Sequence, residues 1–443
     1  MIYADPFSHT MQGQPWINHS WGAQIVLYGV WSLAGNAGLT LFTAALATAG
    51  MFLVYRMCAG SVYVRAFALV LGAATAAVFW SPRPQMFSFV LSAAVLFLLY
   101  LYKRKRIDRL WLIPVVMAVW GNLHAGFSIG FILLAGTIAG EVLGNLFNRG
   151  GEDVIPWRGV RKLVLVTLVS VAALVINPYG LQILTVPFDT VSIGALQNFI
   201  QEWNSPNFHE RQTWPFIALL LATFGAAGAS RKRLGWTDFL LVSGTAFLSL
   251  LAGRNIAVFA VVATPVLTYH LDSVLKERGW AFAPARSATP MQARLNVLLL
   301  ALVFVGALAK VGLALDPKTV QDAQADVLPL GASAYLNGAA PPGPMFNSYN
   351  WGGYLMFAAP DYPVFVDGRT DLYGDTILTT WLGAISAGNE WRDVLEDYGI
   401  NLVVVESGSG LGRALRDEAG WSLDYSDEQA VVFTRDEVAN DNG

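Results

Sequence analysis

The sequence predicts an α-helical membrane protein that crosses the bilayer about ten times and ends in a small α/β domain. Of its 443 residues, 55% are hydrophobic and only 13% are charged, and the mean hydropathy is +0.48. Soluble proteins carry about 25% charged residues, so a water-soluble globular protein is excluded. The single cysteine, Cys58, also excludes an intrachain disulfide framework and a cysteine-rich metal site.

The charges divide the chain near residue 315. The part up to Leu315 contains 22 Lys and Arg against 11 Asp and Glu, whereas the remainder contains 6 against 20. The long hydrophobic stretches end at the same place. We therefore expect three parts: an extracytoplasmic loop with an interfacial helix over residues 1–35, a transmembrane domain over 36–315 and an extracytoplasmic α/β domain over 316–443.

Ten stretches are candidate membrane spans, because a helix needs roughly 20 mostly apolar residues to cross about 30 Å of hydrocarbon. They cover residues 37–55, 66–80, 86–102, 110–121, 126–146, 163–177, 214–229, 237–252, 256–271 and 295–314. The fourth is short, and we expect it to end in a tight hairpin over 121–126. Before the first span, Trp21–Leu33 has a pattern that suits an amphipathic helix lying in the membrane interface.

The basic residues orient these spans. With the hairpin in place, 18 of the 22 cations fall on one face of the membrane, and only Arg83, Arg211, Arg254 and Lys310 fall on the other. Cytoplasmic loops carry such an excess, so we expect the first face to be cytoplasmic and the acidic domain to lie outside. The first segment then also lies outside, yet it has no hydrophobic stretch or signal peptide, so we expect that a first transmembrane helix is missing before it.

Unusual polar residues gather at the outer ends of the predicted helices. Ionisable groups at membrane depth are costly and tend to line polar cavities, so we predict an outward-facing polar cleft that binds substrate. Its expected members are His19, Arg83, Asn122, His124, Tyr179, Glu202 and Arg254. For each residue alone the simpler interpretation stays open: the two arginines extend to lipid headgroups, and the tyrosine anchors a helix end at the interface.

The first segment is dense in side chains that bind sugars. Aromatic faces stack on sugar rings, and a few fixed polar groups hydrogen-bond their hydroxyls. Asp5 and His9 are the candidate catalytic residues, because either could act as a general base for a hydroxyl acceptor. The alternative for Asp5-Pro6 is a turn-forming dipeptide.

The motifs of the chain resemble those of bacterial GT-C-type polytopic membrane glycosyltransferases. The resemblance covers nearly the whole chain and rests on Asp5–Thr10, Gly13–Trp21, Arg83–Gln85, Trp120–Gly126, Asn177–Gly180, Glu202–Pro206, Tyr349–Tyr354 and Val366–Arg369. It implies a GT-C-like fold in the bacterial inner membrane, a sugar donor carried on polyprenyl phosphate and a catalytic acid in the first loop, where Asp5 is the single carboxylate. The family's usual first transmembrane helix and its upstream acidic motif are absent here.

Residues 316–443 read as alternating strands and helices, which predicts a small α/β domain. Strands are expected at 363–367, 401–405 and 430–433, with helices near 375–386, 390–398 and 409–418. Asp367 and Arg369 are candidate acceptor-binding residues, and an ordinary ion pair between them is the competing interpretation. No cluster has metal-ligand spacing, so we predict no cofactor; a divalent cation at Asp367 and Asp371 has no other support.

The predicted function is transfer of a sugar from a polyprenyl-phosphate-linked donor to an unidentified acceptor on the outer face of the bilayer. Two alternatives remain: a non-catalytic protein that binds lipid-linked sugar, and a transporter of a lipid or solute. The sequence shows no internal hydropathy repeat of the kind that transporters often carry. A nucleic-acid partner is excluded because the outer domain is acidic.

Overall fold

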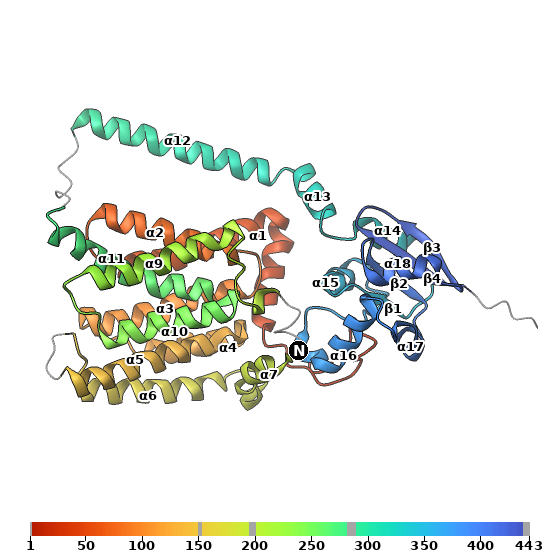
Figure 1. The fold of residues 1–443 in the computed structure, drawn as a ribbon, viewed down its shortest axis with the longest axis horizontal. Helices are drawn as coiled ribbons and strands as arrows, with labels where there is room; N and C mark the ends of the chain where they lie inside the picture. Colours follow the sequence, from red (N-terminus) through yellow and green to blue (C-terminus); the bar gives the residue numbers. More distant parts are fainter. Residues whose placement is uncertain (1, 149–152, 195–200, 281–288, 437–443) are drawn as a thin grey trace, which may run out of the picture. The chain divides into compact units, whose positions relative to one another are not determined.

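In the computed structural model, residues 2–148, 153–194, 201–280 and 289–436 are described, and they form two compact units (Figure 1). The helical unit contains residues 18–188 and 197–292, and the α/β unit contains 1–17, 189–196 and 293–443. The expected first segment, 1–35, is therefore divided between the units after Ile17. Two of the predicted cytoplasmic cations, Arg149 and Arg286, lie outside the described residues.

Each of the ten expected spans coincides with a helix. The helices are α1 (Trp21–Met57), α2 (Val62–Ala76), α3 (Gln85–Lys105), α4 (Leu112–Leu123), α5 (Ser128–Phe147), α6 (Trp157–Leu174), α9 (Trp214–Ala229), α10 (Trp236–Leu251), α11 (Ile256–Glu277) and α12 (Pro290–Ala314). Seven of the described helices are long and apolar enough to cross a membrane, and α4 and α10 are apolar but shorter. The polytopic helical class predicted from the sequence is thereby confirmed.

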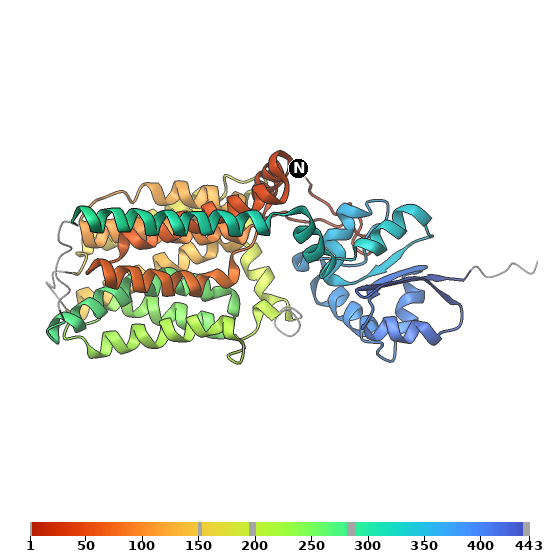
Figure 2. The ribbon, with the colours of Figure 1, turned by 90° about the horizontal axis from the view of Figure 1, so that it is seen from above.

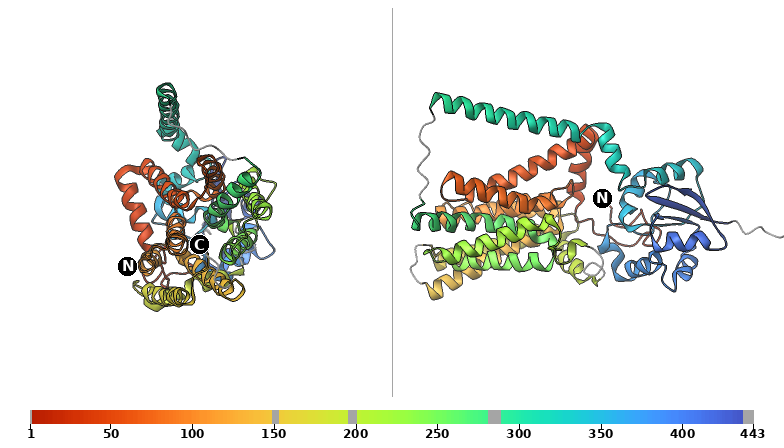
Figure 3. Two further views of the ribbon diagram at one scale, coloured as in Figure 1. Left: turned by 90° about the vertical axis from the view of Figure 1, so that its left-hand side faces the viewer. Right: turned by 45° about the horizontal axis from the view of Figure 1, so that its top comes forward.

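Short elements connect these helices. They are η1 (Ala77–Phe79), η2 (Ala125–Phe127), η3 (Gly180–Leu184), α7 (Val186–Ser192), η4 (Gln201–Trp203), η5 (Arg211–Thr213) and η6 (Gly253–Asn255). The break between α4 and α5 falls at His124, whose backbone is extended (φ −167°, ψ 142°). Within the helical unit, α1 packs on α3, α2 and α9 on α11, α5 on α10, and α4 on α6. The axes of most of these helices run close to parallel or antiparallel, as an end-on view shows (Figure 3).

Helix α1 joins the expected interfacial helix and the first span. The two pieces meet at Gly35, whose φ of 56° and ψ of −147° interrupt the helix. A positive φ is a conformation that glycine adopts without steric cost. The apolar side chains before this break are largely exposed, including Ile25, Tyr28 and Leu33, which is 89% exposed.

The α/β unit contains a four-stranded sheet in the order β1-β2-β4-β3. Its strands are β1 (Met345–Asn347), β2 (Leu402–Glu406), β3 (Trp421–Ser426) and β4 (Ala430–Arg435), and its helices are α13 (Pro317–Ala325), α14 (Leu330–Ala339), α15 (Tyr349–Ala358), α16 (Thr370–Ile385), α17 (Trp391–Asp397) and α18 (Gly410–Ala414), which η7 (Leu415–Asp417) extends. Strand β1 is parallel to β2, and β4 is antiparallel to both β2 and β3. Helices lie on both sides of the sheet within this unit (Figure 2).

Strand β2 has an apolar sequence because it is buried on both faces. Leu402 and Val404 belong to a buried cluster with Leu336 of α14 and Leu355 of α15. The residues between them, such as Val403, are also fully buried. A strand buried on both faces reads as a continuous apolar run, and the strands predicted at 401–405 and 430–433 correspond to β2 and β4.

The strand predicted at 363–367 is wrong. This run forms only an isolated parallel bridge between Ser8 and Val364. Val364 N donates to Phe7 O (3.0 Å), and Phe365 N donates to the Asn347 side chain (2.7 Å) instead of to a strand. Val364–Val366 are apolar because they are fully buried, not because they belong to the sheet.

Candidate functional site

The predicted site residues fall into two groups, one in each unit. Asp5, His9, Asp367 and Arg369 belong to the α/β unit. The remaining candidates, His19, Arg83, Asn122, His124, Tyr179, Glu202 and Arg254, belong to the helical unit. We describe the two groups separately.

Arg369 is the centre of the first group. Its side chain donates three hydrogen bonds to Asp367, from Nε to Oδ1 (2.9 Å) and Oδ2 (3.0 Å) and from Nη2 to Oδ2 (2.6 Å), and it contacts Asp5 through Nη1. Its guanidinium carbon lies 4.9 Å from the ring centre of Trp16 and 5.3 Å from that of Phe7. Arg369 and the two carboxylates are nearly fully buried. This arrangement joins the first segment to a part of the chain more than 350 residues away.

The carboxylate of Asp5 already accepts four hydrogen bonds in this cluster. Besides Arg369, it accepts hydrogen bonds from Phe7 N (3.1 Å), Ser8 N (3.0 Å) and Ser8 Oγ (2.5 Å). Burial alone would raise the pKa of Asp5, but the bonds from Ser8 and Arg369 outweigh it and hold the pKa below 3.8. A carboxylate with this pKa is a weak base, and it stabilises the buried Arg369 cation.

His9 has a different environment although it is close to Asp5 in sequence. Its Nε2 lies 3.0 Å from Met345 O, so Nε2 carries the hydrogen and Nδ1 is an acceptor. Burial lowers the pKa of His9, and the bond to Met345 opposes this only partly. The ring also packs edge-on against Phe365 at 5.6 Å. His9 is therefore held as a neutral imidazole with one basic nitrogen.

Arg254 is the centre of the second group. Its guanidinium carbon lies 4.0 Å from the ring centre of Trp203, and the residue lines a cavity of about 60 Å³. A larger cavity of about 360 Å³ is lined by Arg83 and Glu202, whose charged groups are 3.7 Å apart. Phe79 and Gln85 line both cavities, so the two are neighbours.

Arg83 and Arg254 have different environments, although the sequence predicts the same role for both. The side chain of Arg83 is 65% exposed and that of Glu202 is 36% exposed. An exposed pair of this kind contributes about 0–1 kcal/mol to stability. Arg254 is instead fixed against an aromatic ring, and such a guanidinium presents its N–H edge in a defined direction.

His124 lies beside Arg254 in the smaller cavity and has a fixed tautomer. Ser88 Oγ is 2.7 Å from Nδ1, and Gly126 N donates to the same nitrogen at 3.1 Å. Because Gly126 N donates to Nδ1, this nitrogen is an acceptor, so the Ser88 hydroxyl donates to it while accepting a hydrogen bond from Trp120 Nε1 (2.7 Å). The hydrogen of His124 is therefore on Nε2. Burial lowers the pKa of His124 well below its ordinary value, and the charges of His19 and Arg254 add to this shift.

Two of the other candidates in the helical unit, Asn122 and Tyr179, form hydrogen bonds with backbone atoms. Asn122 donates to Ala118 O (2.8 Å) and Ile176 O (2.7 Å). The Tyr179 hydroxyl, which is buried, accepts a hydrogen bond from Asn18 N (3.1 Å). His19 contacts His124 edge-on, with ring centres 6.1 Å apart. Asn122 and Tyr179 thus have structural bonds, while His19 extends the group around His124.

Several side chains around the candidates were not predicted as site residues, among them Trp203, Ser88 and Tyr373, and Trp120, which contacts Ser88. Trp203 and Trp120 are part of the quoted motifs, and a stacking partner for an arginine could have been sought there. Ser88 and Tyr373 carry no local signal, because their roles depend on helices that are distant in sequence. The Tyr373 hydroxyl donates to Asp367 at 2.7 Å. Among the described residues, no group of three His, Cys, Asp or Glu side chains is arranged to hold a metal ion.

No protein-family model matches this sequence, and no curated protein sequence is significantly similar to it. Solved structures are similar in fold. The archaeal oligosaccharyltransferase AglB from Archaeoglobus fulgidus, in complex with an inhibitory peptide and a dolichol-phosphate, aligns over 91% of this chain with a TM-score of 0.58 and 12% identity. The chain has a GT-C-like fold. It spans 63% of the length of that oligosaccharyltransferase.

Two structures of ArnT from Cupriavidus metallidurans also align with this chain. One is bound to undecaprenyl phosphate and has a TM-score of 0.45 at 13% identity; the other is the apo state, with 0.48 at 16%. Each alignment covers 93% of this chain and 86% of ArnT. The fold assignment rests on the oligosaccharyltransferase alone, since its TM-score is higher.

Proposed function

We propose that this protein is a membrane glycosyltransferase that moves a sugar from a polyprenyl-phosphate-linked donor to an acceptor on the extracytoplasmic face. The GT-C-like fold supports this proposal, and the oligosaccharyltransferase with that fold was solved with a dolichol-phosphate. The expected donor has the same chemistry, a phosphate on a long isoprenoid chain.

The observation that carries the proposal is the pairing of Arg254 with Trp203. A guanidinium held against an indole ring keeps its N–H groups in one plane, which suits the oxygens of a phosphate. The neutral His124 in the same cavity adds one N–H donor at a fixed position, since its tautomer is set by the bond from Gly126 N to Nδ1. The arrangement can bind a phosphate and stabilise the charge that grows on it when the sugar leaves.

In the reaction, an acceptor hydroxyl oxygen forms a bond to the anomeric carbon of the sugar. The bond between that carbon and the phosphate oxygen breaks, and polyprenyl phosphate leaves with the electron pair. The hydroxyl proton passes to a general base. Of the two predicted bases, His9 has an acceptor nitrogen in its neutral state, whereas the oxygens of Asp5 are shared among four donors. We therefore assign the base to His9 and a positioning role to Asp5.

The test uses the purified full chain, polyprenyl-phosphate-linked sugars and a membrane extract as the source of acceptor. Arg254→Gln removes the charge but keeps a side chain of similar length. We expect it to reduce the transfer rate about 10²–10³-fold, the cost of removing one such electrostatic contact. The matched control is Arg211→Gln, an exposed cation that the sequence predicts to lie on the same membrane face.

The control variant should transfer sugar at the rate of the unmodified chain. Equal rates for the unmodified chain and Arg254→Gln would remove Arg254 from the site. Tight binding of the donor without turnover by any acceptor fraction would instead favour the non-catalytic alternative. A melting curve for each variant separates loss of activity from loss of folding.

A further inference from the structure

The helical unit has another cavity, larger than those beside Arg254 and Arg83, which lies among the basic loops. It encloses about 800 Å³ and is formed by the end of α3, by α5, by the start of α10 and by the loop before α10. None of the residues discussed above as site candidates lines it. The sequence predicts that these loops face the cytoplasm.

The floor of this cavity is a charged network that is already neutralised. Lys103 pairs with the buried Glu141 and also donates to Thr237 Oγ1 (3.3 Å). Arg104 pairs with Asp238 (2.5 Å) and Asp153 (2.7 Å). Because these cations have carboxylate partners, they do not by themselves call for an anionic ligand.

Two further cations line the cavity and, among the described residues, have no carboxylate within ion-pair distance. Lys232 and Arg233 lie in the loop before α10, and within the described part of the chain neither forms an ion pair. Lys232 Nζ lies 4.2 Å above the ring of Tyr269, which also lines the cavity. The lining thus has four cations against two carboxylates, Glu141 and Asp153, and its excess charge is positive.

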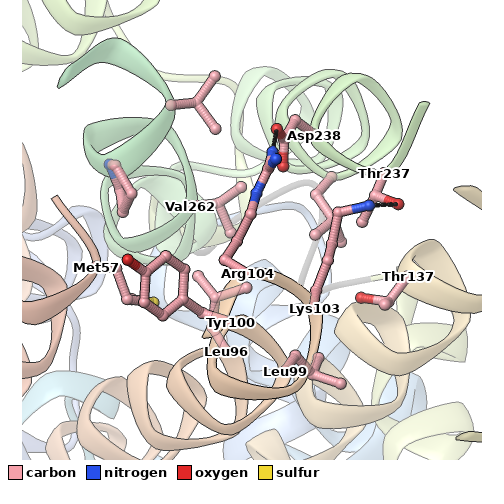
Figure 4. A pocket seen from close by; sticks show the side chains of 13 residues that line it. Met57, Leu96, Leu99, Tyr100, Lys103, Arg104, Thr137, Thr237, Asp238 and Val262 are labelled. Atoms are coloured by element: carbon pink, nitrogen blue, oxygen red, sulfur yellow. Dashed lines mark hydrogen bonds and ion pairs between the residues drawn. The ribbon is translucent and has the colours of Figure 1, made fainter. Parts of the chain in front are cut away.

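The surroundings of the cavity are apolar and aromatic. Phe147 and Trp236 line it, are 71% and 40% exposed, and have ring centres 5.9 Å apart. Exposed aromatic side chains at helix ends are typical of the membrane interface. A mostly apolar pocket of about 70 Å³ adjoins this cavity and shares Lys103, Arg104 and Thr237 with it (Figure 4).

We propose that this cavity binds the headgroup of an anionic phospholipid from the cytoplasmic leaflet. Lys232 and Arg233 contact the phosphate, and the aromatic rim lies against the upper acyl chains. Basic pockets between transmembrane helices on the cytoplasmic side bind such headgroups. The proposal does not depend on the proposed transferase activity, because the two cavities share no lining residue.

The experiment measures lipid binding by native mass spectrometry of the full chain, with short-chain phosphatidylglycerol and phosphatidylcholine as probes. Lys232→Gln/Arg233→Gln removes the two unpaired cations and leaves the neutralised floor intact. With about 1 kcal/mol for each cation near a lipid headgroup, we expect the apparent affinity for phosphatidylglycerol to fall roughly 30-fold. Affinity for phosphatidylcholine should change less than about threefold, because a zwitterionic headgroup gains little from the same charges.

Arg231→Gln/Arg278→Gln is the matched control, because it removes two exposed cations near the same loop that do not line the cavity. It should keep most of the affinity for phosphatidylglycerol. Equal losses in the two double variants would overturn the proposal, since binding would then follow total charge. Glycerol phosphate competing as strongly as phosphatidylglycerol would also overturn it, because the site would then take a soluble phosphate. Melting curves of both variants verify that each is folded.

Discussion

At the scale of single residues, the α/β unit depends on one buried arginine with two carboxylates. Arg369 is held by the neighbouring Asp367 and by Asp5, which is 364 residues away in the sequence. Removing one partner of a buried ion pair leaves an uncompensated charge and costs about 3–5 kcal/mol. Asp367 remains when Asp5 is lost, so the effect of Asp5 should fall at the lower end of this range.

Asp5→Asn and His9→Gln distinguish positioning from catalysis. Asp5→Asn should lower the free energy of opening of residues 2–16 by about 3 kcal/mol, measured by hydrogen exchange. His9→Gln keeps a donor for Met345 O, so it should leave exchange unchanged but reduce transfer about 10²–10⁴-fold as loss of a general base does. Unprotected exchange in His9→Gln, or normal protection in Asp5→Asn, would reverse the two assignments.

The pH dependence of this protection follows from the lowered pKa of Asp5. A carboxyl with a lowered pKa in the folded state contributes its stability fully above its ordinary value of 3.8. That contribution is lost as the pH falls below 3.8 and through the folded value. Protection of residues 2–16 should therefore decline below about pH 4 in the unmodified chain and stay insensitive to this range in Asp5→Asn.

At the scale of elements, α5 and α10 approach each other at a glycine. A Cβ on Gly140 would lie 2.4 Å from the Cα of Thr237, and backbone atoms cannot move aside as a flexible side chain can. The close approach also lets Thr237 Oγ1 donate to Glu141 at 2.6 Å. Gly140 therefore allows close packing of α5 and α10, which carry Glu141 and Thr237 of the cavity proposed to bind lipid.

Gly140→Ala should lower the stability of the helical unit by about 1–3 kcal/mol, the usual cost of overpacking. Gly244→Ala is the control, because Gly244 lies in α10 with open space around its added Cβ. That change should be neutral or stabilising by about 0.5–1 kcal/mol, since alanine favours a helix. Thermal unfolding of both variants in the same detergent measures the difference, and equal melting temperatures would show that α5 and α10 separate freely.

At the scale of the whole molecule, hydropathy predicted the helices well, because each apolar run is long enough to specify a helix without its neighbours. Strand β3 escaped prediction although its sequence alternates apolar with polar residues, a pattern typical of a strand; most of its residues are exposed. The division of residues 1–35 between two units also escaped it, since the contact between Asp5 and Arg369 leaves no periodic pattern. The same holds for the bond from Ser88 to His124, which joins two helices.

The predicted sidedness can be tested with thiol labelling, because the chain's own cysteine should contribute little background. Cys58 is buried, and burial raises its pKa to about 11, so it reacts poorly. Asp417→Cys and Arg231→Cys each add one exposed thiol, in the acidic domain and in a basic loop. A membrane-impermeant reagent should label Asp417→Cys in intact cells and Arg231→Cys only after lysis. Labelling of both in intact cells would contradict the predicted topology.

The attachment of the first segment to Arg369 has a consequence for biosynthesis. The partners are 364 residues apart, and ribosomes add about 5–20 residues per second. Roughly 20–70 s thus pass between translation of the acid and translation of the guanidinium that neutralises it. Throughout that interval the nascent chain lacks the cation that pairs with Asp5, so the first segment can reach its final fold only after Arg369 has been made.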